Sequence, residues 1–170
     1  MVTETLRLYA GLHRHFQLPY PLLHPPHPKE IAMQVQAYLS FAGRCEEALE
    51  YYKKHVGAEV TTLMRWSDSP DPEMKGSPGH EQKIMHAAFK VGDSALMADD
   101  GMGAPGKAEF KGITLALSAA SEAETKRLFG ALSDGGSVQM PLTKTFWTSS
   151  FGMLTDRFGV PWMVMTESEP

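Results

Sequence analysis

Histidine is the side chain in this sequence best suited to metal binding and proton transfer, and four of the seven histidines lie in the first 32 residues. Close histidines such as His13 and His15 can share a metal ion. The same segment holds five of the twelve prolines, however, and cannot keep a helix or central strand that would hold such ligands in place. We therefore expect residues 1–32 to be a disordered leader or a non-native extension, with Met33 as the native start, and not a metal site.

Two further features could carry chemistry, and we expect neither to do so. Cys45 lies on an apolar helix face, which is typical of a buried structural thiol and not of a nucleophile with a lowered pKa. Residues 101–106 match the Gly-x-Gly-x-x-Gly pattern of dinucleotide-binding loops, but that pattern must open a helix. Residues 107–117 lead into a strand instead, so the glycines are predicted to form a linker between two modules.

Length and composition limit what the chain can do. With 170 residues, 42% of them hydrophobic and 21% charged, the chain has the size and composition of one globular domain. Its formal charge of -4 argues against a phosphate backbone as partner, so we expect no nucleic acid. No apolar run is as long as a membrane span, and a single cysteine cannot form an internal disulfide. These features predict no membrane partner and a cytoplasmic location.

The residues after the leader contain one pattern of strands and helices twice. Hydrophobic periodicity predicts a helix at 45–54 among strands at 34–41, 59–66, 83–91 and 94–98. The second half repeats this order, with a helix that ends near residue 133 among strands at 113–117, 138–140, 151–155 and 162–166. Each half is a β-α-β-β-β module too small to bury its sheet alone. We expect an α+β fold in which the paired modules form a curved, cupped mixed sheet around a shared cavity.

Local signals predict the helix ends and one long loop. Gly57 is expected to close the first helix, and Ser121 with Glu124 forms a capping box at the start of the second. The stretch 67–80 contains three prolines and two glycines among polar residues, so it is predicted to be a loop between two strands. Loops of this length are either functional lids or mobile segments, and both interpretations stay open.

Several motifs resemble one known family. They are Phe-Ala-Gly-Arg-Cys-Glu-Glu-Ala-Leu-Glu-Tyr-Tyr at 41–52, the strand with His86-Ala87 that ends in Gly-Asp-Ser, Thr-Phe-Trp at 145–147 and Asp-Arg-Phe-Gly-Val-Pro-Trp at 156–162. In this order they are similar to the PhnB-like branch of the vicinal oxygen chelate superfamily, which includes glyoxalase I, bleomycin-resistance proteins, fosfomycin-resistance enzymes and extradiol dioxygenases. The resemblance implies one domain at 33–167, with module one at 33–100 and module two at 108–167. It also implies a homodimer with the site inside the cupped sheet.

The resemblance also bears on cofactors. Metal-dependent members hold a divalent ion with side chains on the first strand of each module and on the final strand, and the match puts Gln36, Gly112 and Met163 at these positions. Glycine and methionine offer no hard ligand, so we expect no metal and no other cofactor, with a divalent metal in a rearranged site as the alternative. Relatives with a ubiquinone-biosynthesis methyltransferase label exist, but a nucleotide-containing cofactor needs a parallel α/β sheet, for which this chain lacks the pattern.

The remaining candidates are typical of a small-molecule pocket, in which apolar walls supply affinity and a few polar groups orient the ligand. The predicted pocket residues are Gln36, Tyr38, His86, Met97, Trp147, Phe151 and Met163. The same aromatic side chains could instead belong to an ordinary core, and His86 is equally well explained as a structural histidine.

Three hypotheses for function follow, and the sequence assigns no catalytic residue. The first is a metal-free homodimer that binds a small organic molecule, as resistance-type members do by sequestration. The second is a metal-dependent lyase, isomerase or dioxygenase that uses Gln36, His86 and an acidic group such as Asp99 in a rearranged site. The third is a regulatory or interaction module, for which bulky side chains filling the cavity would be the structural sign.

Overall fold

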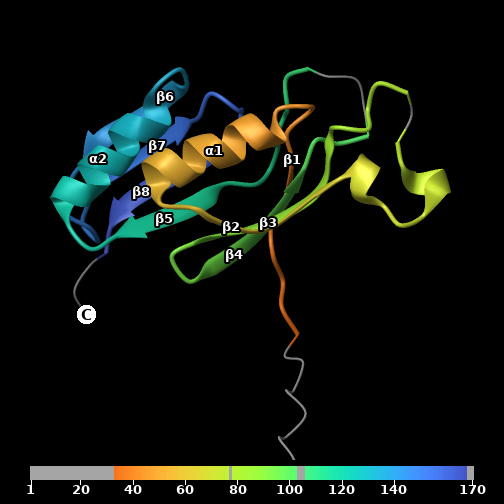
Figure 1. Ribbon diagram of the computed structural model, residues 1–170. Coiled ribbons are helices and arrows are strands. Elements are labelled where there is room, and N and C mark those ends of the chain that lie inside the picture. The colour runs from red at the N-terminus through yellow and green to blue at the C-terminus, as the bar shows by residue number, and fades with distance from the viewer. Residues whose placement is uncertain (1–32, 77, 103–105, 168–170) are drawn as a thin grey trace, which may run out of the picture. The chain divides into compact units, whose positions relative to one another are not determined.

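Module one of the computed structural model has the predicted strand and helix order (Figure 1). The structure describes residues 33–76, 78–102 and 106–167. The elements of module one are β1 (Tyr38–Ser40), α1 (Cys45–Val56), β2 (Glu59–Arg65), β3 (Ile84–Val91) and β4 (Ser94–Asp99). Its four strands form one sheet in the order β1-β4-β3-β2, in which β1 runs parallel to β4 and the other neighbours are antiparallel.

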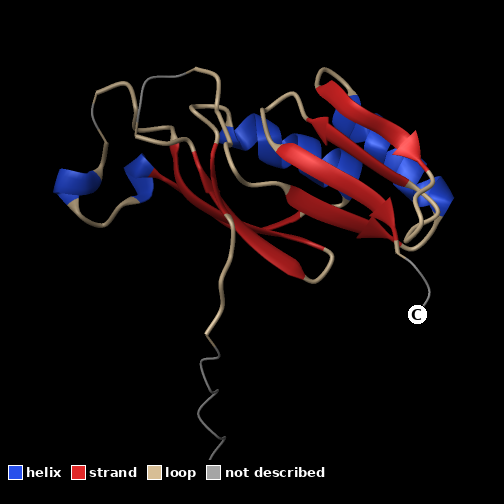
Figure 2. Cartoon of the chain, turned by 180° about the vertical axis from the view of Figure 1, so that it is seen from behind, coloured by secondary structure: helices blue, strands red, loops and turns tan. Residues whose placement is uncertain are grey.

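Module two repeats this arrangement. It consists of β5 (Leu115–Ala119), α2 (Glu122–Ser133), β6 (Ser137–Thr143), β7 (Phe151–Thr155) and β8 (Pro161–Thr166). The sheet order is β5-β8-β7-β6, again with one parallel pair, β5 with β8. Seen from behind, the strands of this sheet lie in front of the helices, so that one sheet face is covered and the other is open (Figure 2). The predicted α+β fold of two β-α-β-β-β modules is confirmed.

Two strands differ in length from the prediction. The strand expected at 34–41 is paired only at Tyr38–Ser40. The strand expected at 138–140 extends over Ser137–Thr143 and includes Pro141. Proline cannot donate a ladder hydrogen bond, but β6 is an edge strand, where the missing donor is tolerated. Periodicity cannot detect either effect, because both depend on the neighbouring strand.

The helix ends follow their local signals with one exception. Gly57 closes α1 in the left-handed conformation with φ 71, which a residue with a side chain adopts only with strain. At the start of α2, the Ser121 hydroxyl accepts a hydrogen bond from the Glu124 N–H at 3.2 Å. In a full capping box the Glu124 carboxylate would accept a hydrogen bond from the Ser121 N–H. Here that carboxylate instead accepts two hydrogen bonds from the Arg127 guanidinium group. Only half of the predicted capping box therefore forms.

A buried carboxylate joins the two modules. Asp156 follows β7, is only 3% exposed and accepts hydrogen bonds from the Tyr52 hydroxyl of α1 at 2.6 Å and from Trp162 Nε1 at 2.9 Å. The backbone N–H groups of Phe158 and Val160 complete its shell at 2.9 and 3.0 Å. Because every lone-pair direction of this buried anion has a donor, the module junction has one well-defined geometry.

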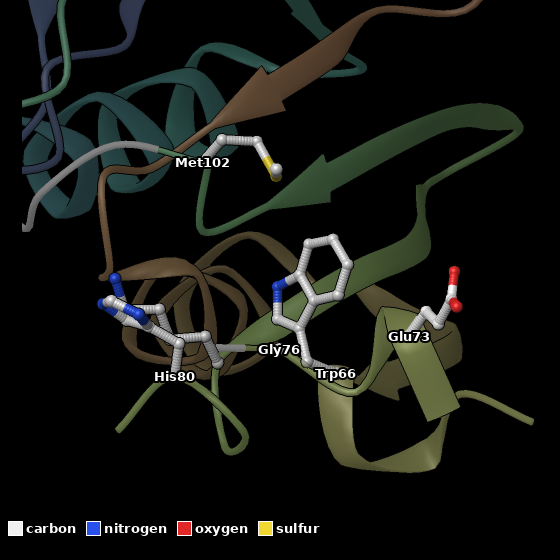
Figure 3. Close-up of a pocket in the computed structure, with 7 residues that line it drawn as sticks. Trp66, Glu73, Gly76, His80 and Met102 are labelled. Carbon is white, nitrogen blue, oxygen red and sulfur yellow. The ribbon is translucent and has the colours of Figure 1, made fainter. Parts of the chain in front are cut away.

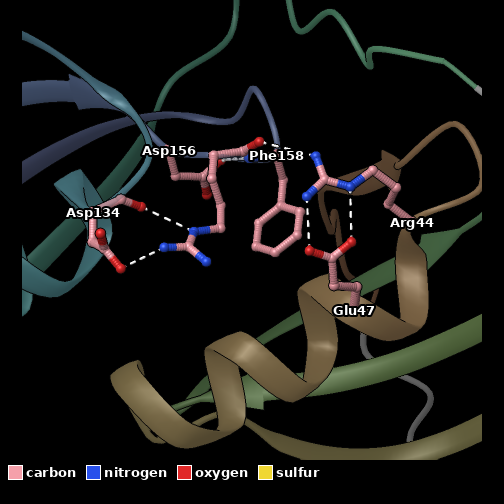
Figure 4. A network of polar contacts seen from close by, with 6 residues as sticks. Arg44, Glu47, Asp134, Asp156 and Phe158 are labelled. Carbon is pink, nitrogen blue, oxygen red and sulfur yellow. Dashed lines mark hydrogen bonds and ion pairs between the residues drawn. The ribbon is translucent and has the colours of Figure 1, made fainter.

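Arginines surround this junction (Figure 4). Arg44 forms an ion pair with Glu47 at 2.8 Å, donates to the Arg157 carbonyl at 3.1 Å and lies over the Phe158 ring. Arg157 in turn bonds to Asp134, on the turn after α2. The modules therefore meet through α1 and the turn that contains Asp156. No helix in the part of the chain that the structure describes is long and apolar enough to cross a membrane.

The predicted leader and the centre of the predicted linker lie outside the residues that the structure describes. Residues 1–32, with His13 and His15, and the central residues 103–105 of the glycine-rich stretch are not among the described residues. Cys45 is fully buried on α1, and burial raises the pKa of its thiol, as expected of a structural cysteine.

Candidate functional site

The predicted pocket residues of module one lie on the sheet face that α1 leaves open. Leu39, Ala87 and Ala98 are buried on the helix side of their strands. Their sequence neighbours point the other way, because side chains alternate along a strand. Tyr38 pairs with Met97 across the parallel β1 and β4 strands. His86, one residue before Ala87, therefore lies on the same open face, as does Asp99 after Ala98.

Tyr38, His86 and Asp99 form a polar cluster on this face. The Tyr38 Oη and His86 Nδ1 atoms are 3.4 Å apart, within hydrogen-bond distance, and the two rings lie 6.0 Å apart between centroids. Burial and the charge of Asp99 raise the pKa of the Tyr38 phenol, so this hydroxyl remains a hydrogen-bond donor at neutral pH. Tyr38 is still 46% exposed. The cluster thus offers a donor, an imidazole and a carboxylate to a ligand.

The predicted residues of module two lie on the corresponding open face of the second sheet. Met163 pairs with Ala116 on one side and with Met153 on the other. Phe151 lies on the same face two residues before Met153, and the Trp147 ring packs against it at 5.0 Å between centroids. Trp147 is 42% exposed whereas Phe151 is buried. This face offers thioether and aromatic surface in place of ionisable groups.

The structure thus divides the predicted residues into two sets. Tyr38, His86 and Met97 lie together on the first sheet, and Trp147, Phe151 and Met163 lie together on the second. Gln36 precedes β1 and is half-buried, outside the paired part of the strand. Asp99 lies on the same sheet face as Tyr38 and His86. This follows from the pairing of β1, β3 and β4 and could not be predicted from the spacing of these residues in the sequence.

A cavity that sequence reasoning did not assign lies at one end of module one. It measures about 380 Å³ and is lined by Trp66, Glu73, Gly76, His80, Lys83, Gly101 and Met102. Three of these residues, Glu73, Gly76 and His80, come from the long loop predicted at 67–80. The loop length was the only signal available, because its polar composition names no pocket residue. The loop contains two short 3-10 helices, Trp66–Asp68 and Pro72–Met74.

The side chains at the family's metal positions do not fit a divalent ion. The resemblance implies Gln36, Gly112 and Met163 at these positions, and of the three only the Gln36 side chain carries an oxygen that could coordinate such an ion. Glycine and methionine offer no hard ligand. Among the described residues, no group of three or more His, Cys, Asp or Glu side chains is placed to hold a metal.

Comparison with known proteins gives the family of the chain. Residues 33–165 match the family described as 3-demethylubiquinone-9 3-methyltransferase. Protein YjdN of Escherichia coli K12 is 36% identical over 139 residues, which cover 78% of this chain and 94% of that protein. The structure of protein PA1353 from Pseudomonas aeruginosa is 46% identical, with a TM-score of 0.70, and covers 81% of this chain and 100% of that one.

More distant structures share the fold. A protein from Bacillus cereus described as a putative 3-demethylubiquinone-9 3-methyltransferase, PhnB protein, has a TM-score of 0.67 at 24% identity and covers 79% of this chain and 100% of its own. The fosfomycin resistance protein FosX from Mesorhizobium loti has a TM-score of 0.54 at 11% identity, over 81% of this chain and 94% of its own. The fold is that of the glyoxalase/bleomycin resistance proteins, and the chain belongs to the 3-demethylubiquinone-9 3-methyltransferase family.

Proposed function

We propose that this protein binds a small organic molecule on the open faces of its sheets, without a metal ion, as a homodimer. The observation that carries this proposal is the cluster of Tyr38, His86 and Asp99 on the sheet face that α1 leaves open. Partly exposed polar groups beside apolar side chains such as Met97 are typical of ligand sites, in which the polar groups orient the ligand.

The second sheet supports the homodimer. Met153, Met163 and the Trp147–Phe151 pair leave apolar surface on a face that α2 does not cover. Exposed apolar surface of this kind marks a site of interaction. A second copy that places this face over the polar face of the first would enclose a ligand between a polar wall and an apolar one. Sedimentation equilibrium tests this part, and a monomer at micromolar concentration would contradict it.

The methyltransferase named in the family's description is not part of the proposal. Methyl transfer from a nucleotide-containing cofactor is expected in a sheet of parallel strands that alternate with helices. Each sheet here has one parallel pair and two antiparallel pairs. The arrangement instead favours binding between sheet faces.

One observation also favours a metal-dependent enzyme as a second candidate. His86 faces the open side of the sheet, and Asp99 is placed in the adjacent strand on the same side. Together with Gln36 these residues are the ligands that a rearranged metal site would use. An imidazole and a carboxylate are suitable first ligands for a divalent ion, although Gln36 would have to move toward them.

Metal titration separates the two candidates. We would titrate Mn²⁺, Ni²⁺ and Zn²⁺ by calorimetry into chelator-treated protein that starts at Met33, so that the histidines of residues 1–32 cannot contribute. The metal-free proposal expects no stoichiometric binding. Stoichiometric binding that His86→Ala abolishes, while the matched control His55→Gln keeps it, would instead establish the metal-dependent candidate.

Ligand binding is tested directly by a thermal-shift screen of small organic molecules, followed by calorimetry. We expect hits whose affinity falls about tenfold in Tyr38→Phe, because the variant loses one hydrogen bond to the ligand and little else. If every hit binds Tyr38→Phe and His86→Ala as tightly as the native protein, the polar cluster is not the binding site and the proposal is wrong.

A further inference from the structure

The loop between β2 and β3 encloses a cavity that the proposed function does not use (Figure 3). The cavity of about 380 Å³ lies where β2 ends, β3 begins and the chain leaves β4. A volume of this size falls within the range of small-molecule sites. None of Tyr38, His86, Met97 or Met163 lines it. It therefore needs an explanation of its own.

Hydrogen bonds at the base of the loop hold the cavity walls. The Trp66 N–H donates to the Lys83 carbonyl at 3.2 Å, and the Ser67 N–H donates to the Glu81 carbonyl at 2.9 Å. Arg65 Nη1 adds a hydrogen bond to the Gln82 carbonyl at 2.7 Å. The two sides of the loop thus continue the β2–β3 ladder beyond the strands. The walls are held in place, as a binding site requires.

One wall of the cavity is aromatic. Trp66 is half-buried, and its indole ring lies between the labelled side chains of His80 and Glu73, with the Met102 thioether opposite it (Figure 3). Gly76 approaches this ring closely, since a Cβ atom on Gly76 would lie 3.0 Å from Trp66 Cβ at a φ of +87. A larger residue would displace the indole. Met102 is 87% exposed, so the indole supplies most of the apolar wall, and its flat surface favours a flat, apolar ligand.

A positive charge lies in the same cavity. Lys83 is half-buried, and its ammonium group forms no ion pair within the described part of the chain. An ammonium group without a carboxylate partner can pair with a bound anion, and a charge-assisted hydrogen bond to a carboxylate is stronger than one between neutral groups. Glu73 also lines the cavity, but it is exposed, so water screens its carboxylate more strongly.

We propose that this cavity is a second ligand site, which binds a planar aromatic carboxylate. The aromatic ring lies against Trp66, and the carboxylate accepts hydrogen bonds from the Lys83 ammonium group. Both groups come from the ends of the same strand pair, so their spacing does not depend on the rest of the loop. The cavity lining does not include Tyr38, His86 or Asp99, so its residues differ from those of the polar cluster, although the Gly101 N–H in its wall donates to Asp99 Oδ1 at 2.9 Å.

Three probes with one ring system test the charge preference. Calorimetry with 2-naphthoate, its neutral amide and the cation 2-naphthylmethylamine should show saturable binding of the carboxylate and at least about tenfold weaker binding of the other two. Equal binding of the amide would show that Lys83 does not select the ligand. Tighter binding of the amine would show that Glu73 dominates the cavity. Either result overturns the proposal, as does the absence of carboxylate binding.

Matched variants locate the site. Lys83→Ala should weaken 2-naphthoate binding about tenfold, whereas Lys90→Ala, near the other end of the strand that follows Lys83, should change it less than about twofold. Trp66→Leu should also weaken binding. His86→Ala removes a group of the first proposed site and should leave 2-naphthoate binding unchanged. Equal losses in Lys83→Ala and Lys90→Ala, or a loss in His86→Ala, would place the carboxylate elsewhere and contradict the proposal.

Discussion

Module one and module two have the same strand order, but their buried aspartates bind different partners. Asp100 is 5% exposed and accepts hydrogen bonds from the N–H groups of Cys45 and Ile84, both at 2.7 Å. It joins the start of α1 to the start of β3 within one module. Asp156 binds its own turn and also the Tyr52 hydroxyl of the other module. In a repeated fold, a buried aspartate can therefore connect two elements of one module in the first half and connect the two modules in the second half.

The open sheet faces differ in the same way. The first carries the ionisable side chains Tyr38, His86 and Asp99, and the second carries apolar ones such as Met153 and Met163. Neither set is required for the core, because the core lies on the helix side of each sheet. The two faces can therefore differ without loss of the fold, and in the proposed dimer they would supply the polar and apolar parts of the ligand site.

The largest expected effect on stability is that of Asp156→Ala. The variant leaves four donors without their acceptor at the junction, and we expect the free energy of unfolding to fall by about 3–4 kcal/mol. Urea unfolding measures this as a lower midpoint at an unchanged slope. Asp134→Ala is the control, because it removes an aspartate with a 71% exposed side chain and should cost less than about 1 kcal/mol.

Asp100→Ala should have the second largest effect, about 2–3 kcal/mol, because only two donors lose their acceptor. Amide hydrogen exchange tests whether Asp100 and Asp156 act independently. Protection should fall at Cys45 and Ile84 and remain at Phe158 and Val160, whose acceptor is Asp156. Loss of protection at all four amides would mean that the two aspartates are not independent.

Tyr52→Phe removes one of the four hydrogen bonds to Asp156, and we expect a smaller loss of about 1–2 kcal/mol at neutral pH. Burial and the charge of Asp156 raise the pKa of the Tyr52 phenol, so the folded protein keeps this proton. The unfolded chain releases it near pH 10. The phenol's contribution is thus present below about pH 10, and stability falls above it by up to about 1.4 kcal/mol per pH unit.

Urea unfolding between pH 8 and pH 11 tests this sign. Tyr52→Phe should show a shallower loss of stability above pH 10 than the native protein. The Cys45 thiol is a second buried acid, because burial also raises its pKa. It should therefore add a loss of stability that starts near the usual thiol pKa of about 8.5. Cys45→Ala removes this contribution and leaves that of Tyr52. An alkaline slope that neither variant changes would contradict both assignments.

The smallest effects on stability are expected on the open faces. Tyr38→Phe and Met163→Leu should each change the free energy of unfolding by less than about 0.5 kcal/mol, because neither side chain is fully buried. Their effects on ligand affinity should differ, with a loss of about tenfold in Tyr38→Phe and of about twofold in Met163→Leu. Calorimetry with a ligand from the thermal-shift screen measures both. Equal losses would show that the two faces contribute alike.

Much of the fold is predictable from local sequence. The apolar spacing of Cys45, Ala48, Leu49 and Tyr52 predicts the buried face of α1, and all four residues are buried. Strand alternation was less informative for His86, because alternation cannot tell which sheet face a helix covers. The register with neighbouring strands resolves this and brings Asp99 to the same face.

The repeated modules, their helices and the family can be predicted without the structure, because they depend on short-range periodicity and on motifs such as Asp-Arg-Phe-Gly-Val-Pro-Trp at 156–162. Tertiary structure alone decided the division of the predicted pocket residues between two open faces, the role of Asp156 and the cavity at Trp66 and Lys83. Each of these joins residues that are far apart in the chain. Such contacts are selected by the packing of the whole domain, and no local pattern encodes them.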